Sequence, residues 1–510
     1  MAELSFEVRT AWKNHLGNQS VEPLRIYEPD SIEQVVAIVQ EAEKSGVTAR
    51  AVGSGHAWSD VALTTGFLIK TSRLARVPAS EPDFIRPAWE GRRLVRAEAG
   101  IRIRELNSFL DGRGLGLPNM GGYDHQTLAG VISTSTHGSG ITFGPLNDFV
   151  RSIDLVASGG RAYRIERSDG PTDRAAYESH HGGRRTFVQD DHWFDAVCVG
   201  MGCMGVLCTV MIEVEPKYFL TEVRRFHTWK EVRKDLEDGE VLRTNRHYEV
   251  LFSPYKRKHE YPCLVTTRNY TQNPSHKWFT KRTRSWLVEA ASAFPLTPHV
   301  INLLVDIRPS LSPLLLENAI RALIKDEYDG VSYEVLNIGA ANLLPAYSCE
   351  IGVPMDGRHI EAVQRIIEVA ADRRRIGDVY QSSPISFRFV RASSAYMSMM
   401  NGTDTMMIEL IELTRADGGY ELLAAYEEAL YRLGGRPHWG QVNSLTGSHG
   451  LIASMYPRFG DWLDVHRRLN ESGTFDSSFT ERVGISRERF GPEARSASAV
   501  EGLSPSGASG

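Results

Sequence analysis

Residues 50–60 read Arg-Ala-Val-Gly-Ser-Gly-His-Ala-Trp-Ser-Asp, and the fold is read most directly from this stretch. The β-branched run that leads into it predicts a strand ending in a Gly-Ser-Gly turn. Consecutive backbone N–H groups in such a turn form a concave surface that binds a pyrophosphate without a helix dipole. His56 follows at the mouth of the loop, where a lone histidine is more often a hydrogen-bonded loop residue than a functional one. The stretch therefore predicts an anion-binding loop made of Gly53, Ser54 and Gly55.

A second segment, 118–150, is rich in Gly, Ser and Thr and almost lacks charge. Flexible linkers share the small residues, but they do not interleave apolar ones such as Leu128, Val131 and Ile132. Small side chains let the backbone approach a ligand closely, and hydroxyl groups add hydrogen bonds. We interpret the segment, with His137 in Thr-His-Gly-Ser-Gly, as a second wall for the same ligand. Tight backbone packing alone is the alternative.

Residues 200–205, Gly-Met-Gly-Cys-Met-Gly, match the GxGxxG string of dinucleotide-binding folds. In those folds the third glycine opens a helix that presents its N-terminus to the pyrophosphate. Residues 206–214 are instead rich in β-branched side chains and predict a strand. We therefore reject a nicotinamide-binding fold and predict a tight turn between buried strands, with Gly205 and Val206 offering backbone contacts to a cofactor.

The composition is that of an ordinary globular chain. Of 510 residues, 42% are hydrophobic and 24% are charged, which excludes intrinsic disorder and a disulfide-built scaffold. The net charge of −5 provides no basic field for nucleic acid or an anionic membrane. We find neither the apolar core of a signal peptide nor a run of the ~20 apolar residues that span a membrane. We expect a cytoplasmic protein with no nucleic-acid partner and no membrane partner. We also expect no metal, because neither His56, His137 nor His438 has a second ligand nearby in sequence.

Helical periodicity alternates with short β-branched runs in the first hundred residues, and amphipathic helices recur in the second half. Helices are predicted over 31–45, 103–110, 357–375, 418–433 and 459–470. Strands are predicted over 47–52, 67–71, 94–97 and 206–214. Short βαβ units followed by strands indicate an α+β fold.

Four ordered motifs together are far more specific than any one of them. They are residues 50–60, 118–140, 200–210 and 436–441, the last reading Arg-Pro-His-Trp-Gly-Gln. In this order they resemble the aldonolactone oxidase branch of the vanillyl-alcohol-oxidase family of flavoproteins, which includes gulonolactone, arabinonolactone and alditol oxidases. The resemblance covers nearly the whole chain and is thinnest over about 220–340.

This resemblance implies an α+β protein with a two-lobed FAD-binding domain and a substrate (cap) domain built on an antiparallel sheet. The implied boundaries are 1–215 for the FAD-binding domain, 216–437 for the cap domain and 438–490 for a segment that returns to the FAD-binding domain. Residues 491–510 are mostly Ser, Ala and Gly and are expected to form a disordered tail.

The resemblance also implies FAD as the cofactor, linked covalently through His56, because such oxidases usually join the histidine of the GxGH motif to the flavin C8α methyl group. Relatives that react poorly with oxygen carry a larger side chain at the position of Gly121, so a glycine there implies access for O2 and favours an oxidase. The other residues that the resemblance places around FAD are Gly53, Ser54, Gly55, Gly122, Thr127, Gly130, Ser133, Thr134, Thr136, His137, Gly138, Gly205 and Val206.

Two catalytic positions depart from the family pattern. Relatives carry Glu-x-Arg on a strand, whereas this chain has Ser386 before Arg388. Their His-Trp-Gly-Lys ends here in Gln441, so one acid and one base are both replaced by neutral groups. Arg388 still offers a cation for an alkoxide. His438 is the preferred candidate base because an imidazole titrates near neutrality, and Glu350 is the second candidate.

We expect a flavin oxidase that oxidises an alcohol or lactone and reduces O2 to H2O2. Two alternatives stay open. One is a dehydrogenase that uses another electron acceptor and a less polar alcohol, in line with the methionines clustered over 397–407. The other is a flavin-binding protein without turnover, which the replacements at Ser386 and Gln441 motivate. The sequence carries no expectation about the oligomeric state.

Overall fold

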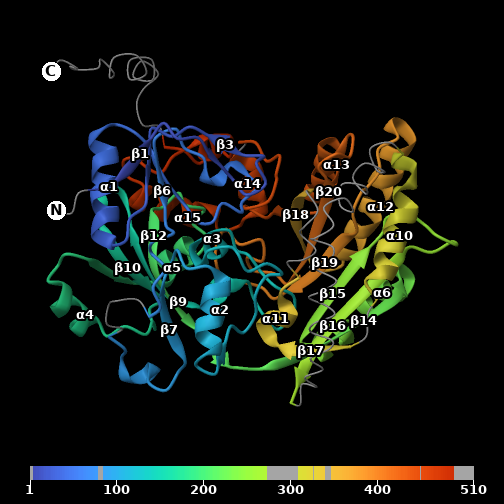
Figure 1. The fold of residues 1–510 in the computed structure, drawn as a ribbon, viewed down its shortest axis with the longest axis horizontal. Helices are drawn as coiled ribbons and strands as arrows, with labels where there is room; N and C mark the ends of the chain where they lie inside the picture. Colours follow the sequence, from blue (N-terminus) through green and yellow to red (C-terminus); the bar gives the residue numbers. More distant parts are fainter. Residues whose placement is uncertain are drawn as a thin grey trace.

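The computed structural model of the chain describes residues 4–78, 84–272, 308–324, 327–338, 346–447 and 449–487. The described strands form three larger sheets and two short ribbons. The ribbons pair β2 (Trp12–Lys13) with β3 (Ser20–Val21), and β8 (Leu115–Gly116) with β13 (Glu215–Pro216). Figure 1 shows two of the larger sheets in one half of the molecule and the third in the other half. Short 3-10 turns span Asp60–Ala62, Pro87–Trp89, Leu146–Phe149, Ser158–Gly160 and Pro309–Leu311.

The first sheet has the strand order β1-β4-β6-β5 and carries helix α1 (Ile32–Lys44). Its strands are β1 (Phe6–Val8), β4 (Arg25–Tyr27), β6 (Phe67–Lys70) and β5 (Ala49–Val52). Strand β6 is parallel to both β4 and β5, as expected for βαβ units. The buried side chains of α1 recur at helical spacing and pack in one core with Tyr27 and Phe67. Because β5 ends at Val52, this sheet positions the Gly-Ser-Gly-His turn that follows.

The second sheet is mixed and has the order β11-β10-β9-β12-β7. Its strands are β7 (Leu94–Glu98), β9 (Val150–Val156), β10 (Ala162–Glu166), β11 (Thr186–Gln189) and β12 (Val206–Glu213). The helices between them are α2 (Ile103–Asp111), α3 (Leu128–Ser133), α4 (Arg174–His181) and α5 (Asp191–Val197). A strand rather than a helix follows the third glycine of residues 200–205, which confirms the rejection of a dinucleotide-binding turn.

The third sheet has the order β17-β14-β16-β15-β19-β20-β18-β21, and every neighbouring pair is antiparallel. Its strands are β14 (Phe219–Thr228), β15 (His247–Phe252), β16 (Pro262–Thr271), β17 (Tyr328–Val331), β18 (Ala346–Pro354), β19 (Ile385–Val390), β20 (Thr405–Leu413) and β21 (Arg436–Pro437). One short helix, α11 (Ser332–Leu336), follows β17 directly. The antiparallel sheet expected of a cap domain is therefore present.

Helices cover one face of this third sheet. They are α6 (Trp229–Asp238), α7 (Glu240–Thr244), α10 (Ser312–Ala322), α12 (Arg358–Gly377) and α13 (Gly419–Tyr431). Trp229, Ile366 and Leu422 from these helices share an apolar core with Phe252 and Phe387 of the strands. Figure 1 shows α6, α10 and α12 along the outer side of the sheet, away from the half that contains α1. The opposite face of the sheet is thus turned toward that half.

The last part of the chain returns to the first half of the molecule. It forms α14 (His449–Met455), α15 (Phe459–Leu469) and α16 (Ser478–Arg482). Ile452, Trp462 and Phe479 pack in one core with Ile153 and Val210 of the second sheet (Figure 1). The predicted α+β class, with two lobes and an antiparallel sheet, is confirmed. The expected tail, 491–510, lies outside the described residues. None of the helices that the structure describes is long and apolar enough to cross a membrane.

Candidate active site

A row of polar side chains lies on the face of the third sheet that the helices leave uncovered. Successive residues of a strand point to opposite faces, and on β19 the aromatic residues are buried among the helices. Ser386 and Arg388 therefore lie on the other face. The strand register pairs Arg388 with Glu249 on β15. It also pairs Glu409 on β20 with Ser386 on one side and with Glu350 on the other. We call these five residues the polar face.

Arg388 lies at the centre of the polar face. Its Nη1 atom is 3.2 Å from Glu409 Oε2 and 3.7 Å from Glu350 Oε1, and its Nε atom is 3.8 Å from Glu249 Oε1. Burial alone would lower the pKa of Arg388, but these three carboxylates raise it. Glu249 is also held by Arg268, whose Nη1 atom is 2.9 Å from its Oε2 atom. The site thus contains a permanent cation that can stabilise a developing alkoxide.

His137 and Glu350 lie side by side in the buried part of the site. His137 Nδ1 is 2.9 Å from the carbonyl oxygen of Gly138, so Nδ1–H donates to that oxygen. Its Nε2 atom faces Glu350 Oε1 at 3.3 Å, where two lone pairs would repel each other unless one atom carries a proton. Burial alone would raise the pKa of Glu350, but His137, His438 and Arg388 together lower it. Glu350 is therefore a carboxylate that faces the His137 ring.

His438 has the opposite hydrogen-bonding pattern. The backbone N–H of Gly440 donates to its Nδ1 atom over 3.1 Å, so the proton of the neutral ring is on Nε2. Burial lowers the pKa of His438 to about 4, which keeps the ring neutral at pH 7. The backbone N–H of His438 donates to the carbonyl oxygen of Glu350 over 2.8 Å. The ring centroid of His438 is 6.1 Å from that of His137. His438 therefore presents a hydrogen-bond donor.

Gln441 occupies the end of the same motif. Ser348 Oγ donates to its Oε1 atom over 2.7 Å. Ser348, Glu350 and Gly352 alternate along β18 and so lie on one face of the sheet, as the sequence predicts. Arg388, Glu350, His438 and Gln441 are linked by direct contacts, because Gln441 N–H donates to the carbonyl oxygen of His438. Ser386 joins them through its register partner Glu409.

The Gly-Ser-Gly-His turn presents an open row of N–H groups. Gly55 has φ +71°, the left-handed conformation that glycine favours. Within the part of the chain that the structure describes, no backbone or side-chain acceptor contacts the N–H groups of residues 53–56. A side chain at Gly53 would collide with Thr127, the N-cap of α3, so the turn packs directly against the second glycine-rich segment. An anion such as a pyrophosphate fits this donor set.

His56 is surrounded by other aromatic rings. Its ring centroid is 4.5 Å from that of His15, 5.0 Å from that of Tyr123 and 6.4 Å from that of His125. Burial, followed by the charges of His15, His125 and Arg102, lowers the pKa of His56 to about 4. The imidazole is therefore neutral at pH 7, and one of its nitrogen atoms has a free lone pair.

The second glycine-rich segment lies between the turn and the polar face. A Cβ atom at Gly121 would lie 3.4 Å from the carbonyl oxygen of His137, an ordinary contact. At Gly122 it would lie 2.6 Å from Ile338 Cγ1 and 3.9 Å from Arg388 Nη2, so this glycine is in close contact with the other half of the molecule. Gly138 is equally constrained, because a side chain there would collide with Asn119.

The remaining predicted cofactor residues lie around α3 and β12. Gly130 N–H donates to Thr127 Oγ1, and Thr134 Oγ1 donates to the carbonyl oxygen of Gly130. Thr136 lies beside Thr134, and the carbonyl oxygen of Ser133 accepts a hydrogen bond from Met201. Gly205 and Val206 both contact Val156 on β9. That strand belongs to the second sheet, whereas the polar face belongs to the third. A cofactor contact for that pair stays a prediction.

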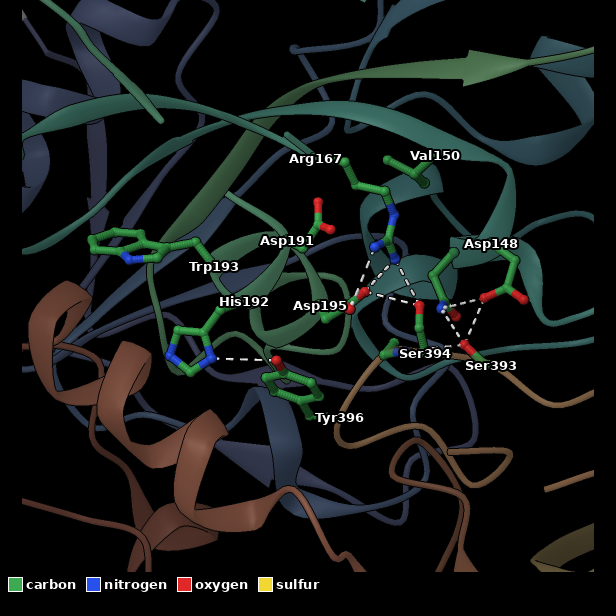
Figure 2. Close-up of polar contacts among 12 residues, drawn as sticks. Asp148, Val150, Arg167, Asp191, His192, Trp193, Asp195, Ser393, Ser394 and Tyr396 are labelled. Carbon is green, nitrogen blue, oxygen red and sulfur yellow. Dashed lines mark hydrogen bonds and ion pairs between the residues drawn. The ribbon is translucent and has the colours of Figure 1, made fainter. Parts of the chain in front are cut away.

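A cluster of hydroxyl and charged groups fixes the loop between β19 and β20 (Figure 2). Ser393 Oγ donates to Asp148 Oδ1 over 2.6 Å, and Ser394 Oγ donates to Asp195 Oδ1 over 2.9 Å. Arg167 bonds both Asp195 and Ser394. The loop joins the two strands that carry Arg388 and a glutamate of the polar face. These contacts therefore hold the polar face against the half of the molecule that contains the glycine-rich segments.

Sequence reasoning missed three residues near these sites. Glu249 and Glu409 join the polar face only through strand register, and nothing in their local sequence indicates that position. His15 reaches His56 through a hydrogen bond from its own N–H to the carbonyl oxygen of Gly55.

Comparisons with known proteins agree with this arrangement. The D-arabinono-1,4-lactone oxidase family model matches residues 210–483, and an FAD binding domain model matches residues 23–166. The L-gulono-1,4-lactone dehydrogenase of Mycobacterium tuberculosis is 26% identical over 486 residues, which cover 92% of this chain and 98% of the relative. The alditol oxidase of a Streptomyces species is 26% identical over 474 residues, with the same coverage of 92% and 98%.

Solved structures agree on the fold. A solvent-stable cholesterol oxidase superimposes with a TM-score of 0.72 at 15% identity, over 95% of this chain and 99% of that chain. At this identity the likeness shows the fold alone. The family match covers more than half of the chain and spans the eight-stranded sheet and helices α14 to α16. The chain therefore belongs to the D-arabinono-1,4-lactone oxidase family of FAD-dependent oxidoreductases.

Proposed function

We propose that the protein is an oxidase that converts an alcohol carbon of a sugar lactone or polyol-like substrate to a carbonyl and reduces O2 to H2O2. FAD, when bound, accepts the hydride of that carbon at flavin N5. The observation that carries the proposal is the polar face, where Arg388 lies among three carboxylates and beside the His137–Glu350 pair. Alcohol oxidation needs such a site, because the hydroxyl group must lose its proton as the hydride leaves.

Each predicted catalytic residue has a role consistent with its contacts. Arg388 stabilises the developing alkoxide through its guanidinium group. His438 donates a hydrogen bond from Nε2 to a substrate oxygen, rather than acting as the predicted base, because its Nδ1 atom already accepts from Gly440. Glu350 holds His137 and Arg388 in place. Ser386 and Gln441 supply neutral hydrogen bonds beside the cation.

The substrate class rests on the relatives and on the polarity of the site. The two relatives above are named for a sugar lactone and for alditols, which are neutral molecules with several hydroxyl groups. A site with alternating hydrogen-bond donors and acceptors suits such molecules. The methionines over 397–407 are fully buried, so they offer no apolar lining for the less polar alcohol considered from the sequence.

Oxygen is the proposed electron acceptor, and a dehydrogenase is the second candidate because one relative is named as a dehydrogenase. The absence of a side chain at Gly121 favours the oxidase. The test is the yield of H2O2 per molecule of lactone or alditol oxidised in air-saturated buffer. One peroxide per substrate supports the oxidase. Turnover that requires an added dye or quinone and yields little peroxide supports the dehydrogenase.

We propose that residues 53–56 bind the FAD pyrophosphate, and that the flavin is covalently linked through His56. The open N–H groups of the turn support the first part. The low pKa of His56 supports the second, because only the neutral imidazole has a nitrogen lone pair free to form a bond to carbon. His15 and Tyr123 hold the ring in its orientation.

Replacing His56 with alanine is expected to abolish covalent flavin while leaving a folded protein. After acid precipitation, the yellow colour of the wild-type protein should stay with the pellet, and that of His56→Ala should move to the supernatant. His125→Ala serves as the matched control, because that ring is farther from His56 and 48% of its side chain is exposed. Colour that is released equally from wild type and His56→Ala would contradict the covalent link.

We also propose the domain boundaries read from the sequence: 1–215 for FAD binding, 216–437 for the cap and 438–490 for the returning segment. The eight-stranded sheet spans residues 219–437, which supports the proposed start and end of the cap domain at 216 and 437. The core shared by α14–α16 and the second sheet supports the last assignment.

A further inference from the structure

Glu409 is a partly exposed carboxylate of the polar face. Its side chain is 17% exposed, whereas that of Glu350 is 4% exposed beneath His137. The side chain of Arg388 is 13% exposed, and its Nη1 atom lies 3.2 Å from Glu409 Oε2. Glu249 is 19% exposed but is bound to Arg268 through its Oε2 atom. Of the described carboxylates around Arg388, Glu409 is the one that is partly exposed and forms an ion pair with Arg388 only.

The two acceptors predicted from sequence are less available to a substrate hydroxyl group. Glu350 is 4% exposed, and its Oε1 atom faces His137 Nε2 at 3.3 Å. His438 presents Nε2–H, because its Nδ1 atom accepts from Gly440. The site therefore needs another group to take the hydroxyl proton, and that group must lie near the cation that stabilises the alkoxide.

We propose that Glu409 takes the hydroxyl proton of the substrate, as a carboxylate that β20 supplies directly across from Ser386 on β19. The inference rests on the proposed function and deepens it. The substrate O–H bond breaks and its proton goes to Glu409, while the C–H bond breaks and its electron pair leaves with the hydride to FAD. The carbon–oxygen bond becomes a carbonyl, and Glu409 returns the proton to water at its exposed edge.

The electrostatic environment fits this role. Burial raises the pKa of Glu409, the Glu350 charge on β18 raises it further, and Arg388 on β19 and His137 oppose the rise. A carboxylate whose pKa lies above the usual range is a stronger base than an ordinary one. These are the charged groups that face Glu409 from the adjacent strands and from the glycine-rich segment.

The first test is Glu409→Gln in the holoenzyme, with flavin reduction followed anaerobically by stopped flow. The amide oxygen of glutamine still accepts a hydrogen bond from Arg388 but cannot take a proton. We expect the reduction rate to fall about 100-fold or more while substrate affinity changes little. The wild-type rate should rise with pH as Glu409 ionises, and this dependence should vanish in the variant. A variant with nearly the wild-type rate and pH profile would overturn the proposal.

Glu412→Gln is the matched control, because Glu412 is on the same strand but its neighbours are on the helix-covered side of the sheet. It should leave the reduction rate and its pH profile unchanged. Infrared difference spectra of the holoenzyme between low and high pH supply a readout besides activity. The band of a protonated carboxyl group that disappears as pH rises should lose one component in Glu409→Gln.

The second test moves a carboxylate from β20 to the paired position on β19. Because Ser386 and Glu409 are register partners on one face, the double variant Ser386→Glu/Glu409→Ser keeps three carboxylates beside Arg388 but places one of them on β19 instead of β20. We expect Glu409→Ser to be inactive and the double variant to regain a large part of the rate. If the double variant is no more active than Glu409→Ser although it binds FAD and Arg388 is intact, the proposal fails.

These outcomes separate the inference from the proposed function. If no lactone or alditol reduces the flavin of the wild-type enzyme, the proposed function fails. If the wild type is reduced and Glu409→Gln is reduced at the same rate, the proposed function stands and only the role of Glu409 fails.

Discussion

Single hydrogen bonds determine what each imidazole of the site can do. The N–H of Gly440 makes Nδ1 of His438 an acceptor, whereas the carbonyl oxygen of Gly138 makes Nδ1 of His137 a donor. The same side chain therefore presents a donor Nε2–H in one case and faces Glu350 Oε1 with its Nε2 atom in the other. Residue type alone predicts a base at His438, whereas the local backbone hydrogen bond places the proton of its neutral ring on Nε2.

Gly121 allows a test of oxygen access at the scale of one methyl group. Its φ lies outside the left-handed region, and a Cβ atom would lie 3.4 Å from its nearest neighbours, so alanine fits without strain. We expect Gly121→Ala to slow reoxidation of the reduced flavin by air about tenfold, a barrier change of about 1.4 kcal/mol. Anaerobic reduction by substrate should stay unchanged.

The control for oxygen access is Gly112→Ala. Gly112 has φ −62° at the end of α2, and its Cβ atom would also meet only ordinary contacts. Reoxidation at the wild-type rate in both alanine variants would contradict a role for Gly121 in oxygen access.

At the scale of helices and strands, periodicity predicted most of the local structure. The helices predicted over 31–45, 357–375 and 418–433 match α1, α12 and α13 to within a few residues, because their apolar stripes are regular. Strand register could not be predicted in the same way. Glu409 lies 23 residues from Ser386 in sequence, and only long-range pairing brings the two side by side. The sequence therefore predicted part of the site but not Glu409.

Strand β20 also carries a carboxyl group on its other face. Burial raises the pKa of Glu412 from 4.5 to about 8, although Ser382 donates to it through both its hydroxyl and its N–H group. A pKa that is raised in the folded state contributes stability that is present below pH 4.5 and is lost as the pH rises through about 8. We expect the stability of the wild-type protein to fall over this range.

Glu412→Gln should remove that loss, because the amide is neutral at every pH. The urea midpoint of the variant should fall less between pH 5 and pH 9 than that of the wild type, with a difference of order a few kcal/mol in unfolding free energy. Glu361→Gln, on the exposed side of α12, is the control and should follow the wild type. If the urea midpoints of Glu412→Gln and the wild type change in parallel with pH, the claim that Glu412 is neutral and buried is contradicted.

At the scale of the whole molecule, the proposed cofactor site and the polar face come from different halves. The Gly-Ser-Gly-His turn belongs to the first sheet, and the polar face belongs to the eight-stranded sheet (Figure 1). The polar cluster of Figure 2 and the contact of Gly122 with Ile338 hold these halves together. Substrate chemistry is expected only where the two halves meet.

The most direct test of the whole account is anaerobic reduction of the purified holoenzyme by a panel of sugar lactones and alditols. The account predicts that at least one of them bleaches the yellow flavin absorbance within seconds, and that admitting air restores the colour with formation of H2O2. A flavin that keeps its full absorbance with every lactone and alditol, while dithionite bleaches it normally, would contradict the account.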